Sequence, residues 1–429
     1  MDPYFEDLSG EALADSDGRL HHLIGAPITG GQGAVYSTRE PGIGLKVFKR
    51  STGGIEVVQR VRRLPIEDLS AIAAPLAALQ DRDGYVMVWL RGMVPIRDIR
   101  LPSGGTERDV LGWYLRTGGL RRRVEICARL AAVIADLHAR GLVYVDLNLT
   151  NAMVSEAVDS TEVRLIDLDN LRLASEGSLS FLTESFAAPE MFSRVPPSFA
   201  SDAYSLAIVI FNTLVGYHPF EDGDLVRNSP DGSPERLRAR HGLLPSFVDP
   251  DDQSNQTDRY LLPLDAVLTS ELLAAFQQCF GPGRKDHWAR PSAAVFARLL
   301  WEAVDNTIRC SCGFTSYRYT SEVCPFCGAA FDDALKVHVR LSRDVEPNLA
   351  TVVVGTDGAT LCQRHLPIPI EPRERLNILA KFRRKENGIE IEPSPRCLCS
   401  ANFVSLGDHC ELTTSSGSTF TLGVSADAD

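Results

Sequence analysis

The sequence predicts an α+β fold spread over two or three domains, and three observations indicate it. Carboxylate and amide side chains, of the kinds that bind metals or transfer protons, lie on two short loops within residues 137–171. A glycine-rich, strand-like stretch lies upstream of them, and eight of the ten cysteines lie in the last third of the chain. At 429 residues the chain is too long for one ordinary domain and long enough to bury a sizeable core.

The composition is that of a globular protein in a reducing compartment. Hydrophobic residues make up 44% of the chain, and the formal net charge of -12 argues against a general nucleic-acid-binding surface. No run approaches the ~18 apolar residues that a membrane-spanning helix needs, and the N-terminal segment is acidic. We therefore expect a cytoplasmic protein without a membrane segment, whose crowded cysteines bind metal rather than form disulfides.

Three polar side chains within residues 137–171 are placed to share one site. Apolar residues run directly into Asp146, the amide of Asn151 follows one short loop later, and a second strand ends at Asp167. Phosphoryl transfer is arranged in this way, because one carboxylate orients the acceptor hydroxyl while an amide and a second carboxylate hold magnesium on the nucleotide. Asp and Asn clusters are also common in ordinary turns. The order and spacing of further motifs along the chain must therefore decide between a phosphoryl-transfer site and simple turns.

This stretch resembles the catalytic and metal-binding loops of protein kinases. Residues 146–151, DLNLTN, stand for the family's D-L-K-x-x-N, and residues 167–169, DLD, stand for D-F-G. Three later segments resemble the A-P-E, S-D-x-Y-S-L-G and R-P-S elements of the larger kinase lobe: residues 187–190 (AAPE), 201–207 (SDAYSLA) and 289–292 (ARPS). The resemblance implies that Asp202 anchors the catalytic loop and that Arg290 forms a buried ion pair with Glu190.

A glycine-rich stretch near the N-terminus offers a phosphate-binding loop. Gly30, Gly31 and Gly33 precede the strand residue Val35, and glycines let backbone amides approach phosphate oxygens closely. The same glycine-rich sequence could instead form a simple hairpin turn. It also departs from the kinase pattern G-x-G-x-x-G, because Ile28 occupies the first glycine position.

Lys46 lies in the next apolar strand, where an inward-pointing lysine usually needs an anion. It resembles the kinase lysine that binds the α- and β-phosphates and pairs with a glutamate on the following helix. Glu56 is the candidate partner, although it follows the lysine sooner than is typical, and Glu67 is the alternative.

Residues 85–92, YVMVWLRG, resemble the strand and connector that bind adenine in kinases. The resemblance places Met87 at the back of the adenine pocket, with Trp89 and Leu90 offering backbone hydrogen bonds. An ordinary core strand would contain the same apolar residues.

Four positions in the two loops depart from the kinase pattern. Tyr144 replaces the histidine of H-R-D and Val145 its arginine, Asn148 replaces the D-L-K lysine, and Asp169 replaces the D-F-G glycine. Asp169 adds a second carboxylate near the magnesium ions, so we expect it to bind magnesium together with Asn151 and Asp167. The combination D-L-N-x-x-N and I-D-x-D-N resembles a divergent bacterial set of Hanks-type Ser/Thr kinases, whose members often occur with von Willebrand A proteins and metal-dependent phosphatases.

The resemblance implies an ATP- and magnesium-dependent protein serine/threonine kinase that acts on protein substrates. Asp146 would orient the substrate hydroxyl, Asn151 and Asp167 would bind magnesium, and Lys46 would position the phosphates. The departures at Tyr144, Asn148 and Asp169 favour the alternative of a nucleotide-binding pseudokinase scaffold. A small-molecule phosphotransferase is a weaker alternative, because the later motifs belong to the protein-substrate lobe.

Four cysteines after residue 304 form two knuckles that predict a structural zinc site resembling a zinc ribbon. The thiolates belong to Cys310, Cys312, Cys324 and Cys327, and a glycine follows each knuckle. Four later cysteines could form a second zinc site, which the sequence alone does not decide: Cys362, Cys397, Cys399 and Cys410.

These features predict four segments. Residues 1–20 would form a flexible leader or a loosely attached strand, and residues 21–303 a bilobal kinase-like domain whose N-lobe ends near residue 90 and whose C-lobe begins at 91. Residues 304–332 would form the zinc ribbon. Short strand-like runs predict a β-rich interaction domain for docking partners over residues 333–429.

Overall fold

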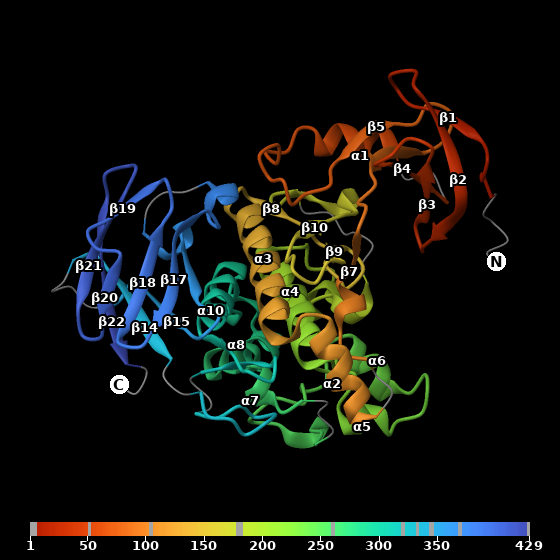
Figure 1. Ribbon diagram of the computed structural model, residues 1–429. Helices are drawn as coiled ribbons and strands as arrows, with labels where there is room; N and C mark the ends of the chain where they lie inside the picture. The colour runs from red at the N-terminus through yellow and green to blue at the C-terminus, as the bar shows by residue number, and fades with distance from the viewer. Residues whose placement is uncertain are drawn as a thin grey trace.

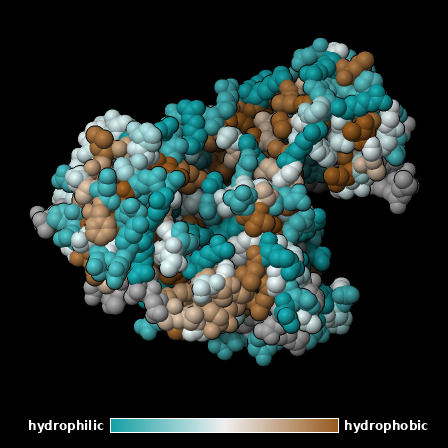
Figure 2. Space-filling view, in the orientation of Figure 1, coloured by the Kyte–Doolittle hydropathy of each residue, from teal (hydrophilic) through white to brown (hydrophobic). Residues whose placement is uncertain are grey.

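An N-terminal β lobe, a helical lobe and a C-terminal β region follow one another along the chain (Figure 1). The computed structural model describes residues 7–49, 53–102, 106–176, 183–258, 262–318, 322–331, 334–342, 347–367 and 371–426. Among these residues, no helix is both long enough and apolar enough to cross a membrane. The face drawn in Figure 2 is mostly hydrophilic, with hydrophobic side chains scattered over all three parts.

The N-terminal lobe is one six-stranded antiparallel sheet with the order β1-β2-β3-β4-β6-β5. Its strands are β1 (Ala12–Ala14), β2 (Leu20–Thr29), β3 (Gly33–Thr38), β4 (Ile43–Phe48), β5 (Pro75–Ala78) and β6 (Gly84–Val88). The short helix α1 (Gly54–Val61) packs on β5 and β6 through three buried valines. A Cβ at Gly54 would lie 2.6 Å from backbone atoms of Gly84, so glycine is needed for this close approach.

The described part of the predicted leader is attached to this sheet rather than flexible. β1 pairs with β2 from Ala12 to Ala14, and Leu8 and Leu13 are buried in the core of the lobe. Of the two expectations for residues 1–20, the structure therefore supports the attached strand over residues 7–20.

The helical lobe is built around α3 (Gly119–Ala139), which packs against α4 (Phe199–Val215) and α10 (Ala293–Asp305). The remaining helices are α2 (Glu107–Arg116), α5 (Asp224–Arg227), α6 (Pro234–Arg240), α7 (Leu264–Val267), α8 (Ser270–Phe280) and α9 (Pro282–Lys285). A capping box between Ser198 and Ser201 begins α4, and Gly216 ends it at a φ of 86°. The α4 helix is buried almost throughout, because apolar residues surround it.

Short strands carry the functional loops over this lobe. They are β7 (Met93–Pro95), β8 (Leu142–Val143), β9 (Ala152–Ser155), β10 (Val163–Leu165) and β11 (Arg172–Leu173). β10, β9 and β7 form one antiparallel sheet, and β11 pairs with β8. These pairings bring the loop before β9 and the loop after β10 to the same end of the lobe.

The C-terminal region contains a hairpin and two antiparallel sheets. The hairpin is β12 (Thr307–Arg309) with β13 (Thr315–Tyr317). The sheets have the orders β15-β14-β22-β21-β19 and β16-β17-β18-β20. Their strands are β14 (Leu335–Arg340), β15 (Ala350–Val354), β16 (Ala359–Cys362), β17 (Ile378–Lys385), β18 (Gly388–Pro393), β19 (Cys397–Cys399), β20 (Phe403–Ser405), β21 (His409–Thr414) and β22 (Thr419–Ala426).

The two C-terminal sheets share a hydrophobic core that is separate from the core of the helical lobe. Figure 1 shows them beside α10, away from the N-terminal sheet. The hairpin belongs to the helical lobe instead, because Ile308 and Tyr317 are buried in that lobe's core. The predicted α+β class with two lobes and a β-rich C-terminal region is confirmed.

Candidate active site

The loop between β8 and β9 takes its shape from Asp202 on α4. Val145 has a φ of 78°, a left-handed conformation that costs a β-branched residue energy. The fully buried Asp202 carboxylate accepts hydrogen bonds from the N–H groups of Tyr144 at 2.7 Å and Val145 at 2.8 Å. His138 Nε2 lies 3.1 Å from the same carboxylate. These contacts hold the strained backbone in place, as the kinase resemblance implied.

Asp146 and Asn151 lie together on this loop. The Asn151 amide nitrogen donates to the Asp146 carbonyl at 2.9 Å and lies 3.4 Å from the Asp146 carboxylate. Burial raises the pKa of Asp146, although hydrogen bonds from Thr183 oppose that shift. The loop therefore presents a partly desolvated carboxylate next to an amide.

Thr183 contacts Asp146 directly, and the sequence pattern does not predict this contact. The Asp146 Oδ1 atom accepts from the Thr183 N–H at 3.0 Å and from the Thr183 hydroxyl at 2.8 Å. Asn148, which replaces the kinase lysine, donates to the Thr183 hydroxyl oxygen at 3.1 Å. The only sequence signal for this role was the position of Thr183 just before residues 187–190.

Lys46 is held by two carboxylates from the loop after β10. Its Nζ donates to Asp167 Oδ1 at 2.7 Å and to Asp169 Oδ2 at 2.6 Å. The Tyr85 hydroxyl donates to the other oxygen of Asp169 at 2.8 Å. Burial is the largest influence on Asp169 and, with the negative charge of Asp167, raises its pKa to about 6 against the opposing effect of Lys46.

Helix α1 does not supply the expected partner of Lys46. Glu56 is exposed in the first turn, and the described side chains that pair with Lys46 are Asp167 and Asp169. The expected pair does not form because the buried valines of α1 face the sheet, which turns Glu56 to solvent. Glu67, the alternative, is also exposed.

Arg60 connects α1 to the loop after β10 instead. Its guanidinium donates to the carbonyl of Asp169 at 2.5 Å and to the carbonyl of Leu171 at 3.3 Å. This link was not expected from the sequence, because an arginine on a short amphipathic helix usually faces solvent.

The glycine-rich stretch forms the turn between β2 and β3. The Gly30 N–H donates to the Gly33 carbonyl at 2.8 Å, and a Cβ on Gly33 would lie 2.3 Å from the Val47 carbonyl. Gly30 and Gly31 have no such crowding and are both exposed, with the Gly30 N–H already used inside the turn. The stretch is therefore a hairpin turn of residues 30–32, in which only Gln32 has a side chain, and Val35 lies opposite Lys46 on the neighbouring strand.

The predicted adenine segment ends β6. Met87, Trp89 and Leu90 are each half-buried. The Trp89 N–H already donates to the Gly42 carbonyl at 2.9 Å, so of its two backbone groups the carbonyl is the one left for a ligand. The Trp89 ring lies against Gly44, where a Cβ would come within 2.8 Å of it.

Glu190 and Arg290 form the predicted ion pair. Two parallel hydrogen bonds of 2.7 Å join the guanidinium to both carboxylate oxygens, and the Arg290 side chain is 1% exposed. The pair fixes residues 187–190 to the helical lobe.

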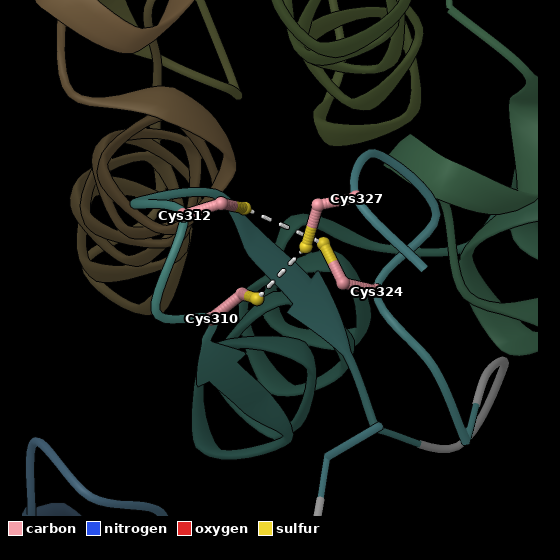
Figure 3. Close-up of side chains that lie close together, drawn as sticks. All are labelled: Cys310, Cys312, Cys324 and Cys327. Atoms are coloured by element: carbon pink, nitrogen blue, oxygen red, sulfur yellow. Dashed lines mark hydrogen bonds between the residues drawn. The ribbon is translucent and has the colours of Figure 1, made fainter. Parts of the chain in front are cut away.

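Four cysteines converge at the hairpin after α10 (Figure 3). The Sγ atoms of Cys310 and Cys327 are 3.5 Å apart, those of Cys312 and Cys324 are 3.7 Å apart, and all four lie within 4.8 Å of one another. Sulfur ligands around tetrahedral zinc are about 3.8 Å apart, which follows from a Zn–S distance of about 2.3 Å. The donor set and its spacing therefore fit zinc.

The later cysteines do not gather in this way. Cys362 lies on β16 in one sheet, whereas Cys397, Cys399 and Cys410 lie on β19 and β21 in the other. Among the described residues, only the four cysteines of Figure 3 form a cluster of three or more candidate ligands. The possible second zinc site is not assembled in this structure.

Comparisons with known proteins agree with this architecture. Residues 119–249 match the family model described as protein kinase domain. Over these residues, which run from α3 past α6, the chain is similar to a protein kinase domain. Ribosomal protein S6 kinase alpha-3 of Mus musculus is 34% identical over 118 residues, which cover 26% of this chain and 15% of that protein. Ribosomal protein S6 kinase 2 alpha of Xenopus laevis is 28% identical over 229 residues, which cover 48% of this chain and 29% of that protein.

One solved structure is also similar. The autoinhibited serine kinase domain of the giant muscle protein titin matches with a TM-score of 0.46 and 15% identity, over 66% of this chain and 79% of that chain. The chain thus spans between 15% and 29% of the length of the two curated relatives named above. The similarity is to kinase sequences within longer proteins.

Proposed function

We propose that the protein is an ATP- and magnesium-dependent protein serine/threonine kinase. The observation that carries the proposal is the meeting of four groups: Lys46, from within β4, donates to Asp167, and Asn151 lies beside Asp146 on the loop before β9. The Ile166 N–H, next to Asp167, donates to the Asn151 carbonyl at 3.0 Å and joins the two loops. Phosphoryl transfer depends on positioning and on charge stabilisation, and these four groups are of the types that it requires.

The residues around this point fit magnesium and a nucleotide. Asp167 keeps 28% of its side chain exposed and Asn151 offers an amide oxygen, so both can hold magnesium. Lys46 would hold the α- and β-phosphates, and the tip at Gly30 and Gly31 would cover them. Met87, Trp89 and Leu90 would line the adenine site. Magnesium, when bound, neutralises charge on the transferred phosphoryl group.

Asp146 would receive the acceptor hydroxyl. The bond between the γ-phosphorus and its bridging oxygen breaks, the acceptor oxygen bonds to that phosphorus, the hydroxyl proton passes to Asp146, and ADP leaves. The Thr183 hydroxyl, which donates to Asp146 at 2.8 Å, supports this role because it shows that the carboxylate accepts from an aliphatic hydroxyl.

Transfer of labelled γ-phosphate to the protein itself or to a generic acceptor protein tests the proposal. Asp146→Ala and Asp167→Ala should abolish labelling. Asp98→Ala is the matched control, because its side chain is 46% exposed and pairs with the adjacent Arg97. Equal labelling by the wild type and both active-site variants would refute the proposal.

The pseudokinase alternative rests on the departures at Tyr144, Asn148 and Asp169. Binding of ATP without turnover across many acceptors would favour it. The small-molecule phosphotransferase is disfavoured by the presence of α4, α8 and α10 and by the Glu190–Arg290 pair, which belong to the protein-substrate lobe.

We also propose that the four-cysteine cluster binds structural zinc, because four thiolates complete a tetrahedral shell and leave no position open for catalysis. The C-terminal β region would serve as a docking module for protein partners.

A further inference from the structure

We propose that Asp169 is the residue that positions Lys46, in place of a glutamate from α1, and that it is not a magnesium ligand. This inference rests on the proposed kinase function. It assigns a role to the residue that replaces the glycine of D-F-G.

Lys46 needs a permanent anionic partner because its side chain is only 7% exposed. A buried ammonium group without a paired carboxylate costs several kcal/mol. Asp169 Oδ2 lies 2.6 Å from Nζ, and the Asp169 side chain is itself 9% exposed, compared with 28% for Asp167. Asp169 is thus the deeper of the two carboxylates and the one further removed from solvent and ligand.

Tyr85 fixes the orientation of the Asp169 carboxylate. Its hydroxyl donates to Oδ1 at 2.8 Å while Oδ2 binds Lys46, so both oxygens are engaged. Lys46 and Tyr85 are direct neighbours in the register between β4 and β6, so both side chains reach Asp169 from one face of the sheet. The carboxylate is therefore held by two residues of the N-terminal sheet.

Asp167 is arranged differently. Lys46 donates to its Oδ1, and among the described residues Oδ2 accepts no hydrogen bond. One carboxylate of the pair thus has an oxygen free for a cation, and the other does not. This difference assigns magnesium to Asp167 and the lysine anchor to Asp169.

The geometry of α1 agrees with this assignment. Glu56 points to solvent, and the helix contacts the loop through Arg60, which binds the main-chain carbonyl of Asp169. The helix thus supplies a cation to the backbone of the loop rather than a carboxylate to the lysine. Lys46 keeps its position without a contribution from the Glu56 side chain.

The test compares Asp169→Asn with wild type in steady-state phosphorylation of a generic acceptor, with ATP and magnesium varied separately. Loss of the anchor should lower kcat at least about tenfold and leave the half-saturating magnesium concentration within about twofold of wild type. Tyr85→Phe should lower kcat by a smaller factor in the same direction. Asp136→Asn is the matched control, because it breaks an ion pair between Asp136 on α3 and Arg375, whose side chains are 10% and 33% exposed, without touching Lys46 or Asp169.

A double-mutant cycle separates an effect through the lysine from an effect through the metal. In a Lys46→Met background, Asp169→Asn should lower residual kcat by no more than about twofold. The inference would be overturned if the kcat losses of Lys46→Met and Asp169→Asn multiply in the double variant. It would also be overturned if added magnesium or manganese restores the kcat of Asp169→Asn. A larger fall in kcat for Glu56→Gln than for Asp169→Asn would also overturn the inference. It would show that Glu56 on α1 positions Lys46.

A failure of the anchor role of Asp169 must be distinguished from a failure of the proposed kinase function. Direct measurement of ATP binding to the wild-type protein makes this distinction. If the wild type neither binds ATP nor transfers phosphate, the kinase proposal fails. If the wild type is active and Asp169→Asn matches it in kcat and in magnesium dependence, only the anchor role fails. Melting temperatures of all variants show whether each one is folded.

Discussion

The hydroxyl of Thr183 donates a 2.8 Å hydrogen bond to the carboxylate of Asp146, and Asn148 donates to the same hydroxyl oxygen at 3.1 Å. Thr183, which shortly precedes residues 187–190, is thereby tied to the loop between β8 and β9 that would receive the substrate. An acceptor hydroxyl would approach the same carboxylate, so Thr183 borders the substrate position.

We expect Thr183→Ala to lower kcat by about tenfold, because a hydrogen bond to a charged group contributes about 1.5 kcal/mol or more. Thr183→Ser keeps the hydroxyl and should restore most of the loss. Steady-state phosphorylation of a generic acceptor measures both variants. Equal losses in the alanine and serine variants would show that the methyl group, and not the hydroxyl, matters.

Glu190→Gln should destabilise the helical lobe by about 3 kcal/mol, because it leaves the guanidinium of Arg290 buried without its charge partner. Urea unfolding measures the loss. Glu302→Gln is the matched control, since the Arg298–Glu302 pair is more than half exposed on both sides and should contribute no more than about 0.5 kcal/mol. Similar losses in the two variants would contradict the buried role of Glu190.

The loops of the candidate site were predictable because their signals are local. Asp146 and Asn151 are five residues apart on one loop, and the strand before Asp167 is read directly from its apolar residues. The two cysteine knuckles were predictable for the same reason, because the glycines at 313 and 328 take the left-handed φ values of 93° and 71° that tight turns require.

The partners of Lys46 were not predictable because they depend on packing between distant segments. Lys46 lies 121 positions before Asp167 and 123 positions before Asp169, and Arg60, which binds the same loop, lies 109 positions before Asp169. Glu56 was expected from its position in sequence alone, but the rotation of α1 is set by which face its valines bury. A sequence gives the amphipathic face of such a short helix only weakly.

Removal of zinc should destabilise the helical lobe as well as the hairpin. The Tyr317 hydroxyl donates to the Val267 carbonyl at 3.1 Å, and Cys310 and Phe314 belong to the core of the lobe. We expect one zinc per chain, and a fall in melting temperature of about 10 °C on chelation or in Cys312→Ser.

Elemental analysis and thermal unfolding measure these effects. Cys399→Ser is the control, because Cys399 lies on β19 in the C-terminal region and should leave the zinc content unchanged. A protein without zinc that melts at the same temperature with and without chelator would contradict the metal assignment.

Asp305 at the end of α10 attaches the C-terminal β region to the helical lobe. Its carboxylate accepts two hydrogen bonds from Arg364, of 2.8 Å and 2.5 Å, and lies 3.1 Å from His365 Nε2. Burial raises the pKa of Asp305, but Arg364 and His365 outweigh burial and hold the pKa below its usual value of about 3.8. A carboxyl whose folded pKa is depressed adds stability above its unfolded pKa and loses it as the pH falls through the folded value.

We therefore expect the attachment to persist at neutral pH and to weaken below about pH 4. Asp305→Asn should release the β region at neutral pH, because Arg364 would then be buried against a neutral amide. Limited proteolysis between the two parts measures the release. Asp357→Asn is the control, since its pair with Arg121 also joins the two parts but is about one-third exposed and contributes little. If Asp305→Asn and wild type are cleaved at the same rate while both are folded, the attachment does not depend on this ion pair.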